Sequence, residues 1–144
     1  MKFKMSVAVS VIIPTRNRAD ILEQTLQSVA RLKGDLRACE VLVVDNGSTD
    51  TTSEVCERAA KLFPENIFSY AYDDTPGLLT GRHLGASLSK GEVLAFLDDD
   101  VVLSPTWLNA IRETIQERSE ASFLTGPTLP LFEEYPPEWL SHFW

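Results

Sequence analysis

The feature that most constrains this chain is a series of three short apolar runs rich in β-branched residues, at residues 7–14, 40–45 and 93–97. A strand with one face in water alternates polar and apolar side chains, whereas these runs are almost continuously apolar. They are typical of strands that are buried on both faces of a sheet. Residues 68–72 favour a shorter strand, and residues 123–126 favour another near the end of the chain.

Helical patterns lie between these runs. Residues 19–30 carry apolar side chains at helical spacing behind an acidic first turn. A turn at residues 46–50 leads into a second helix that reaches residue 61, and residues 79–89 predict a third helix that stops before Gly91. Ser104 and Pro105 have the form of the N-cap and the first residue of a fourth helix.

Strands that alternate with helices predict an α/β fold with a mostly parallel sheet. We expect a Rossmann-like three-layer α/β/α sandwich, in one domain over residues 1–144. A hydrophobic content of 44% is enough for one core in a chain of 144 residues. Cys39 and Cys56 are then expected to be buried, reduced thiols, because two cysteines do not make a disulfide framework.

The net charge of the chain limits the classes of partner that it is expected to bind. A formal net charge of −8 and an isoelectric point near 4.7 disfavour a nucleic-acid binder, whose affinity comes from Lys and Arg that neutralise phosphates. Pro14 and Arg16 interrupt the N-terminal apolar stretch, which is too short for a transmembrane segment. We expect a cytoplasmic protein, either free or peripheral to the inner face of the membrane.

Polar residues follow three of the expected strands, at residues 14–17, at Asp45 and at residues 98–100. Right-handed crossovers place the carboxyl ends of parallel strands on one edge of the sheet, where ligands bind in such folds. The sequence therefore predicts a ligand site at this edge.

Asp98, Asp99 and Asp100 are the most distinctive residues of that edge. Like charges about 5 Å apart repel by roughly 3 kcal/mol at an effective dielectric constant near 20, and a divalent cation removes that cost. Oxygen ligands at a strand end suit Mg²⁺ or Mn²⁺, which often share their coordination with substrate phosphates. A solvated acidic loop is the alternative interpretation.

Asp45 could accept a hydrogen bond from a base N–H such as that of uracil, or it could serve only the turn that follows it. The backbone at residues 14–17 could frame a nucleoside, or it could only end a strand and cap a helix. Arg82 lies near the expected start of the third helix, where anions are favoured, and is a candidate partner for a diphosphate. A surface ion pair is the alternative for Arg82.

The sequence lacks the glycine motifs of two common nucleotide-binding folds. A dinucleotide-binding fold has Gly-x-Gly-x-x-Gly after its first strand, and residues 14–18 contain no glycine. The chain also lacks the Gly-x-x-x-x-Gly-Lys-Ser/Thr pattern of P-loop enzymes.

Four segments in this order, residues 11–18, 43–50, 81–85 and 96–100, resemble family 2 glycosyltransferases. The resemblance implies a GT-A fold, sugar transfer with inversion, and a nucleotide-diphosphate-sugar donor that is often UDP-linked. It implies Mg²⁺ or Mn²⁺ held by Asp100 and Asp98, with Asp100 the better candidate for direct ligation. By the same resemblance the donor nucleotide is bound by Pro14, Thr15, Asn17, Asp45, Arg82, Asp98 and Asp99.

The catalytic base of the family lies on a later acidic motif, so we expect it beyond Trp144 and the acceptor-binding region outside this chain. Glu133, Glu134 and Glu138 are not assigned to this role. A glycan, a lipid-linked molecule and a small molecule all remain open as the acceptor. A non-catalytic nucleotide-sugar-binding module is the alternative function. We also expect a homo-oligomer, because a sheet without the acceptor-side region should expose an apolar face or strand edge, to which Trp139, Leu140, Phe143 and Trp144 would add.

Overall fold

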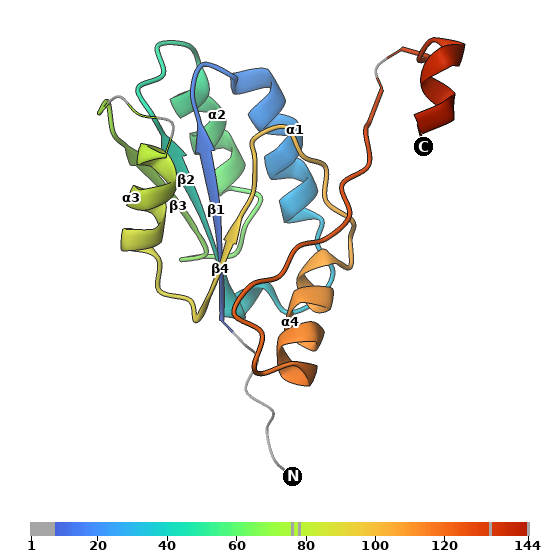
Figure 1. Ribbon diagram of the computed structural model, residues 1–144. Coiled ribbons are helices and arrows are strands. Elements are labelled where there is room, and N and C mark those ends of the chain that lie inside the picture. Colours follow the sequence, from blue (N-terminus) through green and yellow to red (C-terminus); the bar gives the residue numbers. More distant parts are fainter. Residues whose placement is uncertain (1–7, 76, 78, 133, 144) are drawn as a thin grey trace.

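The computed structural model describes residues 8–75, 77, 79–132 and 134–143 (Figure 1). Val7, Glu133 and Trp144, on which some expectations from the sequence fall, lie outside these residues. In the described part, strands and helices alternate. In chain order these are β1 (Val9–Thr15), α1 (Ala19–Ala30), the 3₁₀ helix η1 (Leu36–Ala38), β2 (Cys39–Asp45), α2 (Thr52–Ala60), β3 (Phe68–Tyr72), α3 (Thr80–Leu88), β4 (Val93–Phe96), α4 (Trp107–Glu117) and the 3₁₀ helix η2 (Glu138–Phe143).

The four strands form one parallel sheet in the order β3-β2-β1-β4. The register aligns the carboxyl ends of the two central strands, because Thr15 of β1 lies opposite Asp45 of β2. On the other side of β1, Ile12 lies opposite Phe96, so that the loop after β4 also leaves the sheet at this edge. The expected α/β class with a parallel sheet is confirmed.

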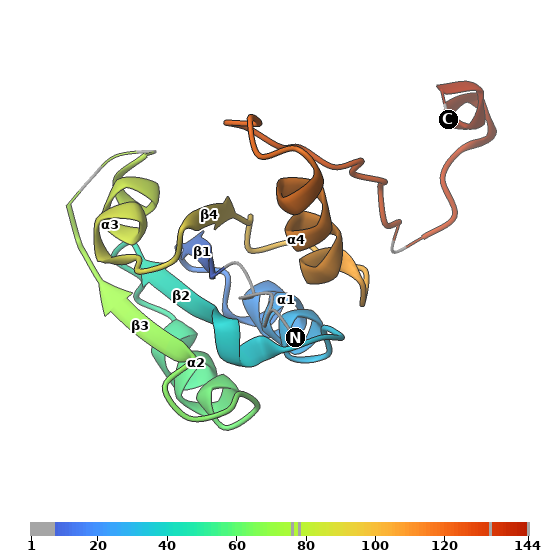
Figure 2. The same ribbon diagram turned by 90° about the horizontal axis from the view of Figure 1, so that it is seen from below.

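Helices cover both faces of the sheet, as the three-layer prediction requires (Figure 2). Helices α1 and α2 pack on one face, with α4 beside α1, and α3 lies alone on the other face. The side chains at the centre of the α1 and α2 side are fully buried, and each contributes about 1.5–3 kcal/mol relative to exposure. They include Val11, Ile13, Leu22, Leu26, Val29, Val41 and Val43.

Helix α3 approaches the sheet closely because it presents glycines to it. A Cβ at Gly85 would lie 2.3 Å from Cγ2 of Ile12, and one at Gly81 would lie 3.0 Å from Cβ of Pro14. No larger side chain fits at Gly85 without movement of β1. The close approach brings the first turn of α3, with Arg82, to the carboxyl end of β1.

Strand β4 corrects the expectation that residues 93–97 form a strand buried on both faces. Leu94 is 41% exposed and Phe96 is 49% exposed, whereas Ala95 and Leu97 are buried. The reason is that β4 is an edge strand of the described sheet, and α3 packs against β1 and β2 rather than over β4.

Two further expectations are wrong. Residues 123–126 form no strand, and Phe123 is 83% exposed in an extended segment that pairs with no strand of the described sheet. Helix α4 begins at Trp107 with Thr106 as its N-cap, so Ser104 and Pro105 lie in the preceding turn, where the Ser104 carbonyl accepts a bond from the Trp107 amide. Pro105, which was expected to be the first residue of this helix, lies two residues before the helix begins.

Cys39 and Cys56 are buried and free, as expected. Burial raises the pKa of Cys39 to about 11 and that of Cys56 to about 12, so both thiols stay protonated at neutral pH. None of the helices in the described residues is long and apolar enough to cross a membrane. The expected homo-oligomer stays a prediction; Phe123, Leu129 and Leu131, each more than 80% exposed, are the side chains that bear on it.

The contact between α3 and β1 predicts a clear effect of one methyl group. We expect Gly85→Ala to lower the free energy of unfolding by about 1–2 kcal/mol, because the clash with Ile12 outweighs the better helix propensity of alanine. Urea unfolding measures the difference. Gly126→Ala is the matched control and should stay within about 0.5 kcal/mol, since nothing lies within 4 Å of its added Cβ. Equal stabilities of the two variants would show that α3 does not pack in this way.

Candidate functional site

An open pocket of about 530 Å³ lies at the carboxyl edge of the sheet, between the end of β1, the start of α3 and the loop after β4. Six of the residues predicted from the sequence line it, whereas Asn17 and Asp45 do not. The lining residues are Pro14, Thr15, Arg16, Arg18, Asn46, Gly77, Gly81, Arg82, Asp98, Asp99 and Asp100.

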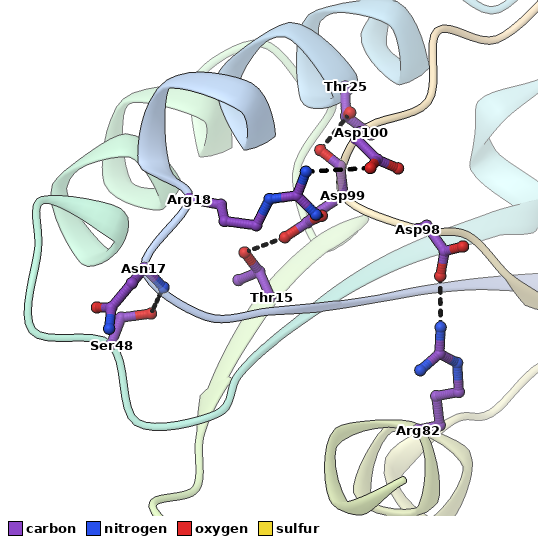
Figure 3. Close-up of polar contacts among 9 residues, drawn as sticks. All are labelled: Thr15, Asn17, Arg18, Thr25, Ser48, Arg82, Asp98, Asp99 and Asp100. Atoms are coloured by element: carbon purple, nitrogen blue, oxygen red, sulfur yellow. Dashed lines mark hydrogen bonds and ion pairs between the residues drawn. The ribbon is translucent and has the colours of Figure 1, made fainter. Parts of the chain in front are cut away.

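Asp99 is the buried centre of this edge, with 5% of its surface exposed. The Thr15 hydroxyl donates to Asp99 Oδ2 over 2.7 Å, and Arg18 Nη1 donates to Asp99 Oδ1 over 2.8 Å (Figure 3). The Thr25 hydroxyl of α1 donates to the Asp99 backbone carbonyl over 2.7 Å. One residue therefore joins the end of β1, helix α1 and the acidic loop.

The other two carboxylates pair with two different arginines, and the arginine that pairs with Asp100 is the one that bonds Asp99 (Figure 3). Arg82 of α3 forms an ion pair with Asp98. Arg18 Nη2 donates to Asp100 Oδ2 over 3.0 Å, and this hydrogen bond is the largest cause of the raised pKa of Arg18, so the guanidinium remains charged. The repulsion expected among three adjacent carboxylates is thus offset by protein cations. The ion pair left open for Arg82 is present, whereas the role of Arg18 was not expected from the sequence.

The side chains of the acidic loop suit the cation that the resemblance implies if a bound substrate shares it. Among the described residues no three acidic, histidine or cysteine side chains come close enough to hold a metal ion by themselves. The Asp98 and Asp100 side chains are 63% and 49% exposed at the pocket. Mg²⁺ typically takes one or two protein carboxylates and completes its coordination with water and substrate phosphates. The donor set therefore fits a hard cation that is shared with a bound diphosphate.

Asp45 lies at the end of β2 and is 2% exposed. Its Oδ1 accepts from the Ser48 amide and its Oδ2 accepts from the Tyr70 hydroxyl, both over 2.8 Å. These bonds hold the turn after β2, in which Gly47 has φ of +78°. The turn role left open from the sequence is therefore present, and a contact between Asp45 and a base stays a prediction.

Asn17 connects the loops after β1 and β2. Its φ of +53° lies in the left-handed region, which asparagine tolerates better than most residues. The Asn17 amide donates to Ser48 Oγ over 2.8 Å, and Asn17 Oδ1 accepts from the Thr49 amide over 2.7 Å. Asn17 thereby fixes the shape of the pocket edge without lining the pocket.

Asp50 strengthens the same connection between the two loops. Its carboxylate accepts from the Ala19 amide at the start of α1 and from the Thr52 amide at the start of α2. The hydrogen bond from the Thr52 hydroxyl is the largest cause of the lowered pKa of Asp50. One side chain therefore caps two helices that begin at the same edge.

Among the lining residues, Arg18, Asn46, Gly77 and Gly81 were given no individual role from the sequence, and Arg16 only a part in the backbone that could frame a nucleoside. Asn46 Nδ2 donates to the carbonyls of Asp73 and Thr75 and so holds the loop that follows β3. A count of charges would have indicated Arg18, because two arginines, at positions 16 and 18, follow the first expected strand while three carboxylates follow the expected strand at residues 93–97. No sequence signal would have indicated the role of Asn46.

Comparison with known proteins identifies the family. The family model described as "Glycosyl transferase family 2" matches residues 10–142. The chain belongs to glycosyl transferase family 2. The resemblance carried by four short segments of the sequence is confirmed over almost the whole chain.

Named relatives of this family 2 chain are considerably longer. Validoxylamine A glucosyltransferase of Streptomyces hygroscopicus subsp. jinggangensis is 33% identical over 144 aligned positions, which take in 90% of this chain and 33% of the relative. Glycosyltransferase AglE of Haloferax volcanii is 36% identical over 107 positions, which take in 74% of this chain and 35% of the relative. The chain thus spans about a third of the length of these two relatives.

Solved structures confirm the GT-A fold of this family 2 chain. The 1-349 form of S. aureus TarS in complex with UDP-GlcNAc matches with a TM-score of 0.70 and 25% identity, over 88% of this chain and 38% of that one. The mannosyltransferase PcManGT from Pyrobaculum calidifontis, in complex with GDP-Man and Mn²⁺, matches with a TM-score of 0.69 and 25% identity, over 77% of this chain and 33% of that one.

The contact between Tyr70 and Asp45 predicts a dependence of stability on pH. Burial first, and then the hydrogen bond to Asp45, raise the pKa of Tyr70 above that of a free phenol. The folded protein therefore retains this proton where the unfolded chain, with a tyrosine pKa near 10, loses it. The resulting stabilisation is present below about pH 10 and is lost as the pH rises toward the folded pKa.

We expect the free energy of unfolding to fall less steeply between about pH 9 and about pH 11 in Tyr70→Phe than in the wild type. Urea unfolding at a series of pH values measures both slopes. Tyr72→Phe, on the same strand, is the control, because the Tyr72 hydroxyl has no hydrogen-bond partner among the described residues. The same slope for Tyr70→Phe and the wild type would count against the hydrogen bond between the Tyr70 phenol and Asp45.

Proposed function

We propose that the protein is an inverting glycosyltransferase that transfers a sugar from a nucleotide-diphosphate donor, a UDP-sugar, to an acceptor hydroxyl with the help of Mg²⁺ or Mn²⁺. The observation that carries the proposal is the pocket at the carboxyl edge of the sheet, where Arg82 and the acidic loop face the end of β1. Membership of glycosyl transferase family 2 supports it, as do relatives named for glycosyl transfer and a structural neighbour bound to UDP-GlcNAc.

Each part of the donor is proposed to meet a different part of the pocket. Pro14 and Thr15 contact the nucleoside at the end of β1, with Asp45 as the acceptor for a base N–H. Asn17 acts on the same subsite through the loop that it holds in place. The first turn of α3 receives the diphosphate, because Arg82 provides a planar cation there and the helix N-terminus favours negative charge.

The acidic loop is proposed to serve the cation and the ribose. Asp100 is the main metal ligand in this proposal, and Asp98 is the second. Asp98 and Asp99 also contact the nucleotide. When bound, a divalent cation offsets the negative charge that develops on the leaving diphosphate. Only Nη2 of Arg82 is engaged by Asp98, so the other guanidinium N–H groups can donate to phosphate oxygens.

Inversion requires one in-line displacement in which a carboxylate removes the proton of the acceptor hydroxyl. No residue of this chain is assigned as that base, and the named relatives extend over about three times the length that is matched here. We therefore propose that the base and the acceptor site belong to the acceptor-side region. This chain would then bind donor without transferring sugar to an acceptor.

The donor site predicts metal-dependent binding of UDP. We expect calorimetry to detect UDP binding in the presence of Mn²⁺ or Mg²⁺ and to detect none in excess EDTA, because a protein with a net charge of −8 needs a cation to receive a diphosphate. GDP measured in parallel tests the choice of base. UDP affinity that is unchanged by EDTA would contradict the shared cation.

Two substitutions are expected to separate the nucleoside from the diphosphate. Asp45→Asn should weaken uridine and UDP alike, by about tenfold, because it removes one charged acceptor from the nucleoside end. Asp100→Asn should weaken UDP measured with Mn²⁺ and leave uridine within about twofold, because only the diphosphate shares the cation. Calorimetry with both ligands measures this pattern, and the reversed pattern would mean that the two roles are exchanged.

A further inference from the structure

Arg18 has no assigned role in the function proposed above, although it contacts two of the three acidic residues. We propose that Arg18 is the positioning residue of the acidic loop. Its guanidinium holds Asp99 in its buried site and at the same time sets the direction of the Asp100 carboxylate. The inference rests on the proposed function only in that Asp100 is taken as a metal ligand.

The geometry of the contact is specific to arginine. Nη1 of Arg18 reaches Asp99 Oδ1 over 2.8 Å and Nη2 reaches Asp100 Oδ2 over 3.0 Å, so one planar fork spans two successive carboxylates (Figure 3). A lysine has a single ammonium group and cannot reproduce two parallel bonds of this kind. The fork therefore holds a particular arrangement of the loop in addition to supplying a charge.

Asp99 gives the fork a rigid support. Its side chain is 7% exposed, and its other carboxylate oxygen accepts from the Thr15 hydroxyl. Thr25 of α1 holds the backbone of the same residue through its carbonyl. Because Asp99 is fixed from three sides, a guanidinium bonded to it is also fixed, and Asp100 is positioned by a rigid partner.

The place of Arg18 in the chain is a second, independent observation. It occupies the N-cap position of α1, where Ser, Thr, Asp and Asn are favoured and a positive charge is unfavourable. Arg18 makes no capping bond with its side chain, and Asp50 from the next loop accepts the Ala19 amide in its stead. An arginine whose side chain does not cap its own helix, and instead bonds the acidic loop, indicates a role in the site.

The fork leaves part of Asp100 available. Arg18 bonds Oδ2, and no described residue donates a hydrogen bond to Oδ1 of Asp100. The Asp100 side chain is 49% exposed, so a cation can reach this oxygen while Arg18 keeps its place. Groups that orient a metal ligand from behind typically change the metal affinity by 10- to 100-fold when they are replaced.

The test compares Arg18→Lys and Arg18→Gln with the wild type by two measurements. The first is Mn²⁺ affinity in the presence of UDP, followed by electron paramagnetic resonance. The second is the backbone order of Asp99 and Asp100 in the metal-free protein, followed by ¹⁵N relaxation. Arg58→Lys is the matched control, because Arg58 of α2 forms an exposed ion pair with Glu23 of α1 and neither residue lines the pocket.

We expect Arg18→Lys and Arg18→Gln to weaken Mn²⁺ binding by about 10- to 100-fold and to lower the order parameters of the loop from about 0.85 toward 0.6. Arg58→Lys should leave both quantities unchanged. Wild-type affinity and order in Arg18→Lys, with losses only in Arg18→Gln, would overturn the proposal, since charge alone would then suffice.

The two measurements separate this inference from the proposed function. If the wild type binds no Mn²⁺ with UDP, the proposed function fails. The backbone order parameters of the metal-free loop then test the positioning role of Arg18 alone. An ordered loop in both Arg18 variants would then overturn the positioning role, and a disordered one would support it. Melting temperatures of all variants identify any that fail to fold.

Discussion

The buried carboxylate of Asp99 is the interaction on which the candidate site depends. It accepts from Thr15 at the end of β1 and from Arg18 at the start of α1, while Thr25 holds its backbone from within α1. A buried carboxylate is costly unless all its oxygens are bonded, and here both are. The acidic loop is therefore attached to the sheet and to a helix, and Asp98 and Asp100 are presented on either side of a fixed point.

The parallel register makes this attachment possible. Thr15 and Asp45 end adjacent strands at the same level, and the loop after β4 leaves beside them, so residues far apart in the chain meet at one edge. Gly85 lets α3 approach Ile12 closely enough to bring Arg82 to Asp98. Tight backbone packing on one face thus sets the position of a charged group at the pocket, a link between fold and chemistry that holds for this family 2 chain.

The strands and the edge at which the site lies could be predicted from the sequence, because β-branched runs and parallel connections follow from local patterns. The exposure of Leu94 and Phe96 could not, since the composition of a run does not tell how many neighbours its strand has. The directions of the three successive aspartates were also beyond prediction, because they depend on Arg18 and Arg82, which come from other elements. Arg18 was overlooked because its two partners lie 81 and 82 positions further along the chain, and no local pattern connects them.

The central claim, that Asp99 joins β1 to the acidic loop, is tested most directly by a double-mutant cycle in urea unfolding with Thr15→Val and Asp99→Ala. A buried bond between two otherwise distant segments predicts a coupling of about 1–3 kcal/mol. The exposed Arg58 and Glu23 pair, measured in the same way, should give only about 0.2–1 kcal/mol. Effects of Thr15→Val and Asp99→Ala that add within about 0.5 kcal/mol would contradict the account, because the two residues would then contribute independently.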